Sequence, residues 1–276
     1  MLKDLLKKKL TKKELALVPS SFDIIGNRDK AVAIIDVPPE LKKKQKLIAT
    51  ALMRQHKNVK TVLAKMSPRK GKYRIMELKI IKGKKDTEVM HIESGCRFLL
   101  DPKKVYFSPR EGSERLRIAE LANEKETIAV FFAGIGPFAI IIAKKAKPKK
   151  VIGIDINPDA VEYFKENIRL NKLENTEAIL GDVKKEAEKF YGLCDRVLMP
   201  LPETSSEYLE EAIKCLKKNG ICHFYCFAEE DKIKENKKTV LVAAKKLKRK
   251  IKFLEVTKVL PYGPRIWKTR IDFIVM

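Results

Sequence analysis

The second half of the chain alternates apolar runs with amphipathic stretches, and this alternation constrains the fold more than any other feature. From residue 127 onward, short runs typical of buried strands are followed by stretches whose apolar residues recur every three to four positions. Helices that connect successive strands place those strands parallel in one sheet. The pattern predicts an open parallel α/β sheet with strands at 127–132, 150–155, 176–180, 195–199 and 220–227, and helices at 137–145, 160–171, 184–191 and 207–216.

The chain ends in a different pattern. After a basic helix expected at 232–246, two β-rich runs at 252–260 and 266–275 flank a Pro-Tyr-Gly-Pro segment. Proline and glycine favour the turn of a hairpin. An antiparallel hairpin that closes a mostly parallel sheet is typical of class I methyltransferase folds and less so of NAD-binding domains, so it favours a Rossmann-like class I methyltransferase domain over an NAD-binding domain.

In the first half, short β-like runs surround a single helix. We expect strands at 31–35, 59–64, 75–81, 88–92 and 97–100 and a helix at 41–56, which together make an α+β module. Residues 1–20 precede this module as a Lys-rich amphipathic segment, either a solvated arm or a binding element. A helix at 113–122 links the halves, and we place the domain division between residues 105 and 106.

Positive charge is concentrated in the first half. The chain carries a net charge of +24, and residues 1–105 hold 27 basic against 11 acidic residues, so 16 of the 24 surplus charges lie there. A hot-living source, which we also expect from only two glutamines, raises Lys and Glu together and does not explain a lopsided surplus. Nucleic acid is therefore the expected partner, held by the first half.

The remaining composition predicts a reduced, cytoplasmic protein. The five cysteines show no metal-like spacing, and we interpret them as reduced core residues; we expect no metal site. The N-terminus lacks the apolar stretch of a signal peptide, and the longest apolar run is interrupted by Gly and Pro. We expect a soluble monomer without a membrane segment.

A glycine-rich turn follows the first strand of the second half. Gly134, Gly136 and Ala139 form G-x-G-x-x-A where a strand meets a helix, and glycine lets the backbone turn sharply and approach a ligand. A tight turn without a ligand would use the same glycines. However, Asp155 ends the second strand, where a carboxylate can accept hydrogen bonds from ribose hydroxyls, and Gly181-Asp182 ends the third. These glycines and carboxylates fit NAD as well as S-adenosylmethionine. The sequence shows no set of residues typical of hydride transfer beside them, which makes an NAD-dependent oxidoreductase the weaker interpretation.

The segment Tyr106-Phe-Ser-Pro-Arg-Glu-Gly-Ser-Glu-Arg115, followed by Phe-Ala-Gly-Ile-Gly-Pro-Phe at 132–138 and Ile-Asp-Ile-Asn-Pro at 154–158, closely resembles the archaeal and eukaryotic tRNA guanine-37 N1-methyltransferase family over roughly residues 20–276. The resemblance implies a small RNA-binding domain joined to a Rossmann-like catalytic domain. It also implies S-adenosylmethionine as the donor and the nucleotide 3′ to the anticodon of tRNA as the substrate.

N1 of guanine carries a proton at neutral pH, so its methylation requires a base and a group that stabilises the negative charge on O6. The resemblance implies Glu114 as the general base, Arg74 as the O6 stabiliser and Tyr106 as a residue lining the flipped base. Without the resemblance, Glu114 is a first-turn carboxylate favoured by the helix dipole, and Arg74 is a solvated strand residue.

Two further sets of residues are expected to bind ligands. The candidate cofactor-binding residues are Arg115, Phe132, Gly134, Gly136, Asp155, Ile156, Gly181, Asp182 and Pro200. The candidate RNA-binding residues are Arg54, Arg69, Lys70, Lys72 and Arg110.

The chain departs from the family at two positions. Val130 stands where the strand before the glycine loop usually ends in an acidic residue, and Pro200 stands where the family has an Asn that helps to hold the target base. Proline offers neither a polar side chain nor an N–H group. Two other functions therefore stay open: a different S-adenosylmethionine-dependent step on the same nucleotide (methylation of a wyosine intermediate or aminocarboxypropyl transfer), and a non-catalytic RNA-binding relative.

Overall fold

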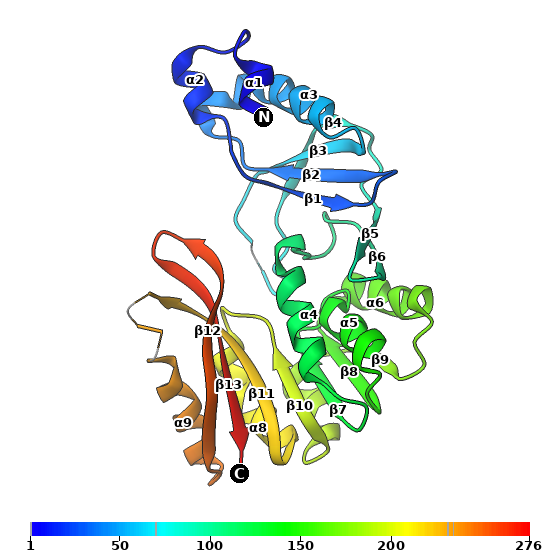
Figure 1. Ribbon diagram of the computed structural model, residues 1–276, viewed down its shortest axis with the longest axis vertical. Helices are drawn as coiled ribbons and strands as arrows, with labels where there is room; N and C mark the ends of the chain where they lie inside the picture. The colour runs from blue at the N-terminus through cyan, green and yellow to red at the C-terminus, as the bar shows by residue number, and fades with distance from the viewer. Residues whose placement is uncertain (1, 70, 231, 234) are drawn as a thin grey trace. The chain divides into compact units, whose positions relative to one another are not determined.

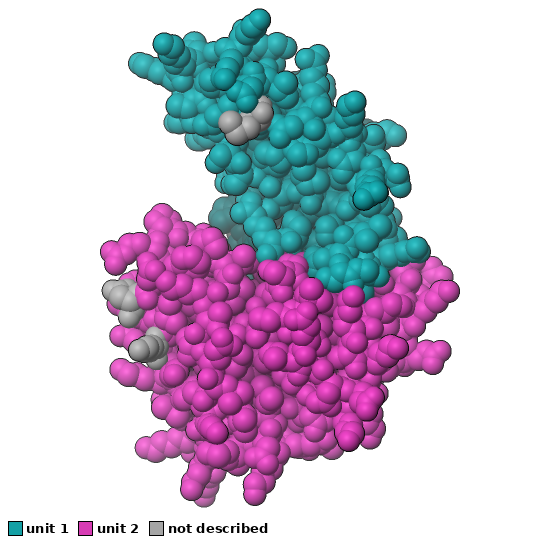
Figure 2. Space-filling view, in the orientation of Figure 1, with its two compact units in different colours: residues 1–110 teal, residues 111–276 magenta. Residues whose placement is uncertain are grey.

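The computed structural model describes residues 2–69, 71–230, 232–233 and 235–276. The chain forms two compact units, Met1–Arg110 and Glu111–Met276, which are coloured separately in Figure 2. The segment from Tyr106 to Arg110 lies in the first compact unit.

The first unit is built on a four-stranded sheet. Strands β2 and β3 are parallel because a helix crosses over between them, and the two outer pairs are antiparallel. A separate antiparallel pair follows. The elements are β1 (Phe22–Gly26), β2 (Ala31–Ile35), the 3₁₀ helix Pro39–Lys44, α3 (Gln45–Gln55), β3 (Val59–Lys65), β4 (Leu78–Gly83), β5 (Val89–Glu93) and β6 (Cys96–Leu100). The predicted α+β module is confirmed, although β1 was not predicted and β4 begins three residues later than expected.

The N-terminal segment is not a solvated arm. It forms α1 (Leu2–Leu6) and α2 (Lys12–Leu17), and Thr11 and Glu14 make a reciprocal capping box at the start of α2. Leu2, Leu6 and Leu10 are buried in one cluster with residues of α3 and the sheet. Burial of these leucines makes the segment part of the first unit's core, so the solvated-arm interpretation is wrong.

The second unit contains a seven-stranded sheet in the order β12-β13-β11-β10-β7-β8-β9 (Figure 1). The five strands from β7 to β11 are parallel, and β12 and β13 form the expected antiparallel hairpin at one edge. The bounds are β7 (Thr127–Phe131), β8 (Lys150–Asp155), β9 (Thr176–Leu180), β10 (Cys194–Met199), β11 (Leu216–Glu229), β12 (Ile251–Gly263) and β13 (Ile266–Val275). The strand order reverses between β7 and β10, which is the switch point where such sheets bind ligands.

Helices cover both faces of this sheet, with α4, α5 and α6 on one side and α8 and α9 on the other (Figure 1). The central strands are accordingly apolar throughout, as in β7, where four of five residues are buried. The helices are α4 (Gly112–Leu121), α5 (Pro137–Ala146), α6 (Pro158–Asn171), α7 (Val183–Glu186), α8 (Leu209–Cys215) and α9 (Asn236–Lys246), with 3₁₀ helices at Ala187–Phe190 and Ser205–Tyr208.

All five cysteines are buried and unbridged, as predicted. Within the described part of the chain, the helices are too short or too polar to cross a lipid bilayer.

Candidate active site

The glycine-rich turn after β7 places three left-handed residues within five positions. Phe132, Gly134 and Gly136 have φ values of 54°, 56° and 83°. Phe132 is notable because residues with a side chain rarely adopt this conformation, and such strain clusters at functional sites. Its ring packs edge-on against Tyr208 with 4.9 Å between centroids. The turn thus connects the carboxyl end of β7 at Phe131 to the start of α5 at Pro137.

Asp155 closes this turn from the neighbouring strand. Its Oδ2 accepts the Gly134 N–H at 2.7 Å, and its Oδ1 accepts the Asn157 N–H at 2.9 Å. Burial raises the pKa of Asp155, although hydrogen bonds from Asn157, Gly134 and Ile156 act in the opposite direction. The predicted ribose-binding carboxylate therefore lies directly at the glycine turn, and Ile156 lies beside it.

The third strand end carries a capping interaction. The Asp182 side chain accepts the Lys184 N–H at 2.9 Å and caps α7. A side chain at Gly181 would meet Glu186, because an added Cβ would lie 2.4 Å from Glu186 Cγ. At the end of β10, the Met199 carbonyl next to Pro200 accepts the Ser205 hydroxyl at 3.2 Å.

In the first unit, Arg74 and Tyr106 line the same pocket. The pocket is open to solvent and is also lined by Asp23, Arg69 and Met76. The Arg69 guanidinium lies 4.0 Å above the centre of the Tyr106 ring, a cation–π contact, and the Tyr106 residue is 41 % exposed. The predicted O6 stabiliser and the predicted base-lining residue thus occur together at one concave surface that carries both positive charge and an aromatic face.

The other predicted RNA contacts are distributed over the first unit. Arg54 and Lys72 are exposed, whereas Arg110 is paired with Asp23 through a 2.6 Å contact between Nε and Oδ1. Lys70 lies outside the described residues.

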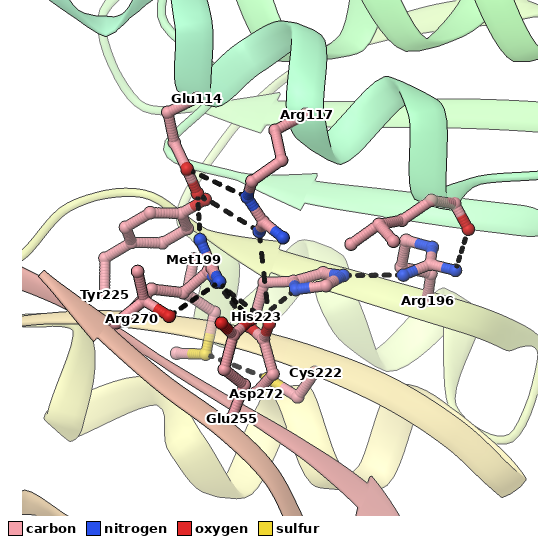
Figure 3. Close-up of polar contacts among 12 residues, drawn as sticks. Glu114, Arg117, Arg196, Met199, Cys222, His223, Tyr225, Glu255, Arg270 and Asp272 are labelled. Carbon is pink, nitrogen blue, oxygen red and sulfur yellow. Dashed lines mark hydrogen bonds and ion pairs between the residues drawn. The ribbon is translucent and has the colours of Figure 1, made fainter. Parts of the chain in front are cut away.

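Glu114 lies in the second unit, on α4, in a buried polar cluster (Figure 3). Its Oε1 accepts the Tyr225 hydroxyl at 2.6 Å and Arg270 Nη1 at 2.7 Å. Arg117, one turn further along α4, donates to Oε2 at 3.1 Å. The next residue, Arg115, is almost fully buried, with 1 % of its surface exposed.

The pKa of Glu114 is set by two opposing effects. Burial raises it, but hydrogen bonds from Arg117 and Tyr225 and the charge of Arg270 outweigh burial, so the pKa lies below the ordinary glutamate value. Glu114 is therefore a carboxylate at neutral pH, the form that can accept a proton, and a weaker base than an exposed glutamate.

The other residues of this cluster were not predicted from the sequence. Arg270 also binds Asp272, Asp272 accepts from His223 Nδ1 at 2.7 Å, and His223 Nε2 lies 2.6 Å from Arg196. A second buried ion pair joins Lys268 on β13 to Glu111 at 2.9 Å. The polar residues that alternate with apolar ones at 222–226 in β11 and at 270–273 in β13 were the available signal, since these two stretches otherwise consist of core residues.

The protonation state of His223 follows from its partners. Arg196 can only donate, so the facing Nε2 must be an unprotonated acceptor, and Nδ1 carries the single proton that is donated to Asp272. Burial, together with the neighbouring Arg196 charge, lowers the pKa of His223 despite Asp272. The imidazole is therefore neutral. Arg196 in turn binds Glu126 and the carbonyl oxygen of Leu121 at the end of α4.

Family models match the two halves of the chain separately. Residues 89–253 match the TRM5/TYW2 methyltransferase domain, and residues 2–87 match the TYW2 N-terminal domain. The chain belongs to the TRM5/TYW2 methyltransferase family.

Relatives within the TRM5/TYW2 family resemble the chain over most of its length. A tRNA (guanine(37)-N(1))-methyltransferase Trm5b from Pyrococcus abyssi is 43% identical over 94% of this chain and 76% of its own length. The solved complex of aTrm5 and tRNALeu has a TM-score of 0.85 and 32% identity, over 100% of this chain and 78% of the other. The structure of M. jannaschii TYW2 in complex with AdoMet has a TM-score of 0.71 and 30% identity, over 92% and 99%.

For this member of the TRM5/TYW2 family, the predicted site residues fall into two groups. Of the predicted cofactor residues, Gly134 and Asp155 are joined by a hydrogen bond at the strand ends of the second unit, while Arg74 and Tyr106 share a pocket of the first unit. That Arg74 and Glu114 face one guanine stays a prediction. The described residues contain no group of three or more His, Cys, Asp or Glu side chains placed to hold a metal ion.

Proposed function

We propose that the chain is a tRNA methyltransferase that transfers a methyl group from S-adenosylmethionine to N1 of guanosine 37. Membership of the TRM5/TYW2 family and 43% identity to a Trm5b enzyme support this proposal. The surplus of positive charge in the first 105 residues fits a polyanionic substrate such as tRNA.

The observation that carries the proposal is the ionised Glu114 on α4. Methylation at N1 needs an acceptor for the N1 proton, and this carboxylate keeps its charge because Arg117, Tyr225 and Arg270 donate to it. Arg74 is the donor that we propose for the charge on O6, and Tyr106 the ring that lines the base.

The residues around the glycine turn fit S-adenosylmethionine. A carboxylate at the end of β8, the left-handed turn at Gly134 and Gly136, and the start of α5 form a compact cradle with an acceptor for ribose hydroxyls. Asp155 would hold the ribose, and Asp182 the adenine amino group. When bound, the cofactor supplies the methyl group as a sulfonium.

The experiment that tests the proposal is mass spectrometry of nucleosides after incubation of unmodified tRNA with S-adenosylmethionine. The wild-type chain should convert guanosine 37 to 1-methylguanosine. Glu114→Gln should reduce the rate by about 10²–10⁴-fold, the usual contribution of a positioned base. Full activity of Glu114→Gln would refute its role as the base, and absence of any methylated guanosine from the wild type would refute the proposed function.

A second candidate function is the other S-adenosylmethionine-dependent step on nucleotide 37, either methylation of a wyosine intermediate or aminocarboxypropyl transfer. Two observations favour it: Pro200 replaces the family Asn, and residues 2–87 match the TYW2 N-terminal domain. The same assay with tRNA that already carries the wyosine intermediate tests this function, because a gain of mass on the intermediate shows that it is the substrate. The size of the gain then separates the two steps, since the aminocarboxypropyl arm adds a larger mass than a methyl group.

We also propose that the chain acts in the cytoplasm as a monomer. A mass measurement by light scattering, with and without tRNA, tests the oligomeric state.

A further inference from the structure

The two carboxylate oxygens of Glu114 have different surroundings (Figure 3). Oε1 accepts short hydrogen bonds from Tyr225 and Arg270, whose residues are 0 % and 1 % exposed. The closest contact to Oε2 is the 3.1 Å bond from Arg117 Nε, and the Arg117 side chain is 32 % exposed. Arg117 Nη2 adds a longer bond of 3.4 Å to Oε1. One oxygen is therefore held by buried donors, and the other by a donor at the edge of the cluster.

The donors to Oε1 are themselves held in place. Arg270 Nε contacts both oxygens of Asp272 at 2.8 and 2.9 Å, and its Nη2 donates to Glu255 at 2.7 Å. The Tyr225 ring packs against Phe138 and lies under the Lys268 ammonium, at 6.0 and 5.0 Å. Because their own partners fix Tyr225 and Arg270, these two side chains can hold the Glu114 carboxylate in one orientation.

Arg117 has an alternative partner. Its Nη2 lies 3.9 Å from Asp272 Oδ2, so the guanidinium can leave Oε2 and remain paired with a carboxylate. Its move would break the 3.1 Å bond to Oε2 and the 3.4 Å bond to Oε1. Oε2 would then be exposed, whereas Oε1 would stay bound to Tyr225 and Arg270.

We propose that Tyr225 and Arg270 are positioning residues for the reaction: they hold Glu114 through Oε1 and leave Oε2 to receive the N1 proton of the target guanine, with Arg117 as a displaceable cover. The inference rests on the proposed function and adds two residues from β11 and β13 to it.

The step is balanced as follows. The N1–H bond breaks, and an O–H bond forms at Glu114 Oε2. The electron pair left on N1 forms the bond to the methyl carbon, and the pair of the broken carbon–sulfur bond stays on sulfur. Oε1 does not take the proton, because two donors already occupy its lone pairs.

Many ionisable groups surround Glu114, so its titration depends on all of them. They come from α4, from the residue before it and from the three strands beneath: Arg117, Glu111, His223, Tyr225, Glu255, Lys268, Arg270 and Asp272. Loss of the Tyr225 hydroxyl removes one hydrogen bond to the ionised form and leaves every formal charge in place, which raises the pKa of Glu114.

The test is the pH dependence of single-turnover methylation by Tyr225→Phe, with Tyr191→Phe as the matched control. Tyr191 undergoes the same chemical change and lies in the 3₁₀-helix-to-β10 connection of the same unit. We expect the acidic limb of the profile to move up by about one pH unit and the rate near neutral pH to fall about tenfold in Tyr225→Phe. Tyr191→Phe should keep the wild-type profile.

A double variant separates positioning from a loss of folding. If Tyr225 acts through Glu114, the Glu114→Gln/Tyr225→Phe variant should be no slower than Glu114→Gln, because the two residues work as a unit. Thermal unfolding and calorimetry with S-adenosylmethionine confirm that each variant is folded and binds the cofactor.

An unchanged pH profile in Tyr225→Phe, or losses that multiply in the double variant, would overturn the inference. Those results leave the proposed function intact, because the wild type still forms 1-methylguanosine. A wild-type chain that leaves guanosine 37 unmethylated would instead overturn the proposed function, and the positioning role with it.

Discussion

Gly136 in the glycine-rich turn and Gly153 in β8 make room for one phenylalanine, and a methyl group added to either glycine should be costly. Phe164 on α6 is fully buried. A Cβ at Gly153 in β8 would lie 2.2 Å from its Cε1, and a Cβ at Gly136 would lie 2.1 Å from its Cδ2. Contacts this short cannot be accommodated without movement of the ring, and the ring is enclosed on all sides by the core.

The size of each effect follows from the backbone. Overpacking of a core costs about 1–3 kcal/mol. Gly153 lies in a strand, where alanine recovers about 0.5–1 kcal/mol of chain entropy, so Gly153→Ala should lose about 1–2 kcal/mol of unfolding free energy. Gly136 has a φ of 83°, and the left-handed region costs a residue with a Cβ about 1–2 kcal/mol. Gly136→Ala should therefore lose about 2–5 kcal/mol, the sum of the two costs.

The assay is urea unfolding followed by tryptophan fluorescence. The chain has a single tryptophan, Trp267 on β13, so the signal reports on the second unit. Phe164→Leu removes the ring atoms that the new Cβ would meet. The double variant Phe164→Leu/Gly153→Ala should therefore lose less unfolding free energy than the sum of the losses of the two single variants, by at least about 1 kcal/mol.

A loss below about 0.5 kcal/mol for Gly153→Ala, the usual range of a neutral surface change, would refute this account of the packing. Equal losses for Gly153→Ala and Gly136→Ala would refute the separate contribution of the left-handed backbone. Because Gly136 belongs to the glycine-rich turn that we propose as part of the cofactor site, Gly136→Ala should also weaken binding of S-adenosylmethionine in calorimetry.

Two further predictions concern pH and salt. Burial and the Arg196 charge lower the pKa of His223 in the folded chain, so the unfolded chain takes up this proton more readily than the folded chain. The contribution of the neutral His223 to the free energy of unfolding is therefore fully present above the unfolded pKa of about 6.5. Below that pH, the free energy of unfolding decreases by about 1.4 kcal/mol per pH unit. Urea unfolding between pH 7.5 and 5.5 should show this decrease in the wild type and a smaller one in His223→Gln, and equal decreases would contradict the neutral imidazole. Charge reversal at Arg54 and Lys72, which are exposed in the first unit, should weaken tRNA binding and reduce its salt dependence while cofactor affinity stays unchanged. An equal loss of both affinities would count against separate binding roles for the two units.

The order of strands and helices in the second unit was predictable from local sequence. The strands expected at 150–155, 176–180 and 266–275 have those bounds in the structure, since each is a β-rich run bounded by residues that do not continue a strand. The glycine turn and Asp155 were also recognisable, because backbone geometry and strand-end position determine their chemistry. Where the expected helices at 184–191 and 207–216 divide into 3₁₀ and α segments, periodicity alone did not distinguish the two.

Only the tertiary structure decided the surroundings of Glu114. Its partners Tyr225 and Arg270 are 111 and 156 residues away in the chain. A local sequence pattern cannot predict which face of which strand packs against α4. The same limit applies to Leu2, Leu6 and Leu10, which a short amphipathic segment could expose or bury, and which the first unit buries. Side-chain periodicity determines which residues share a face of an element, whereas the partner of that face depends on contacts between distant segments.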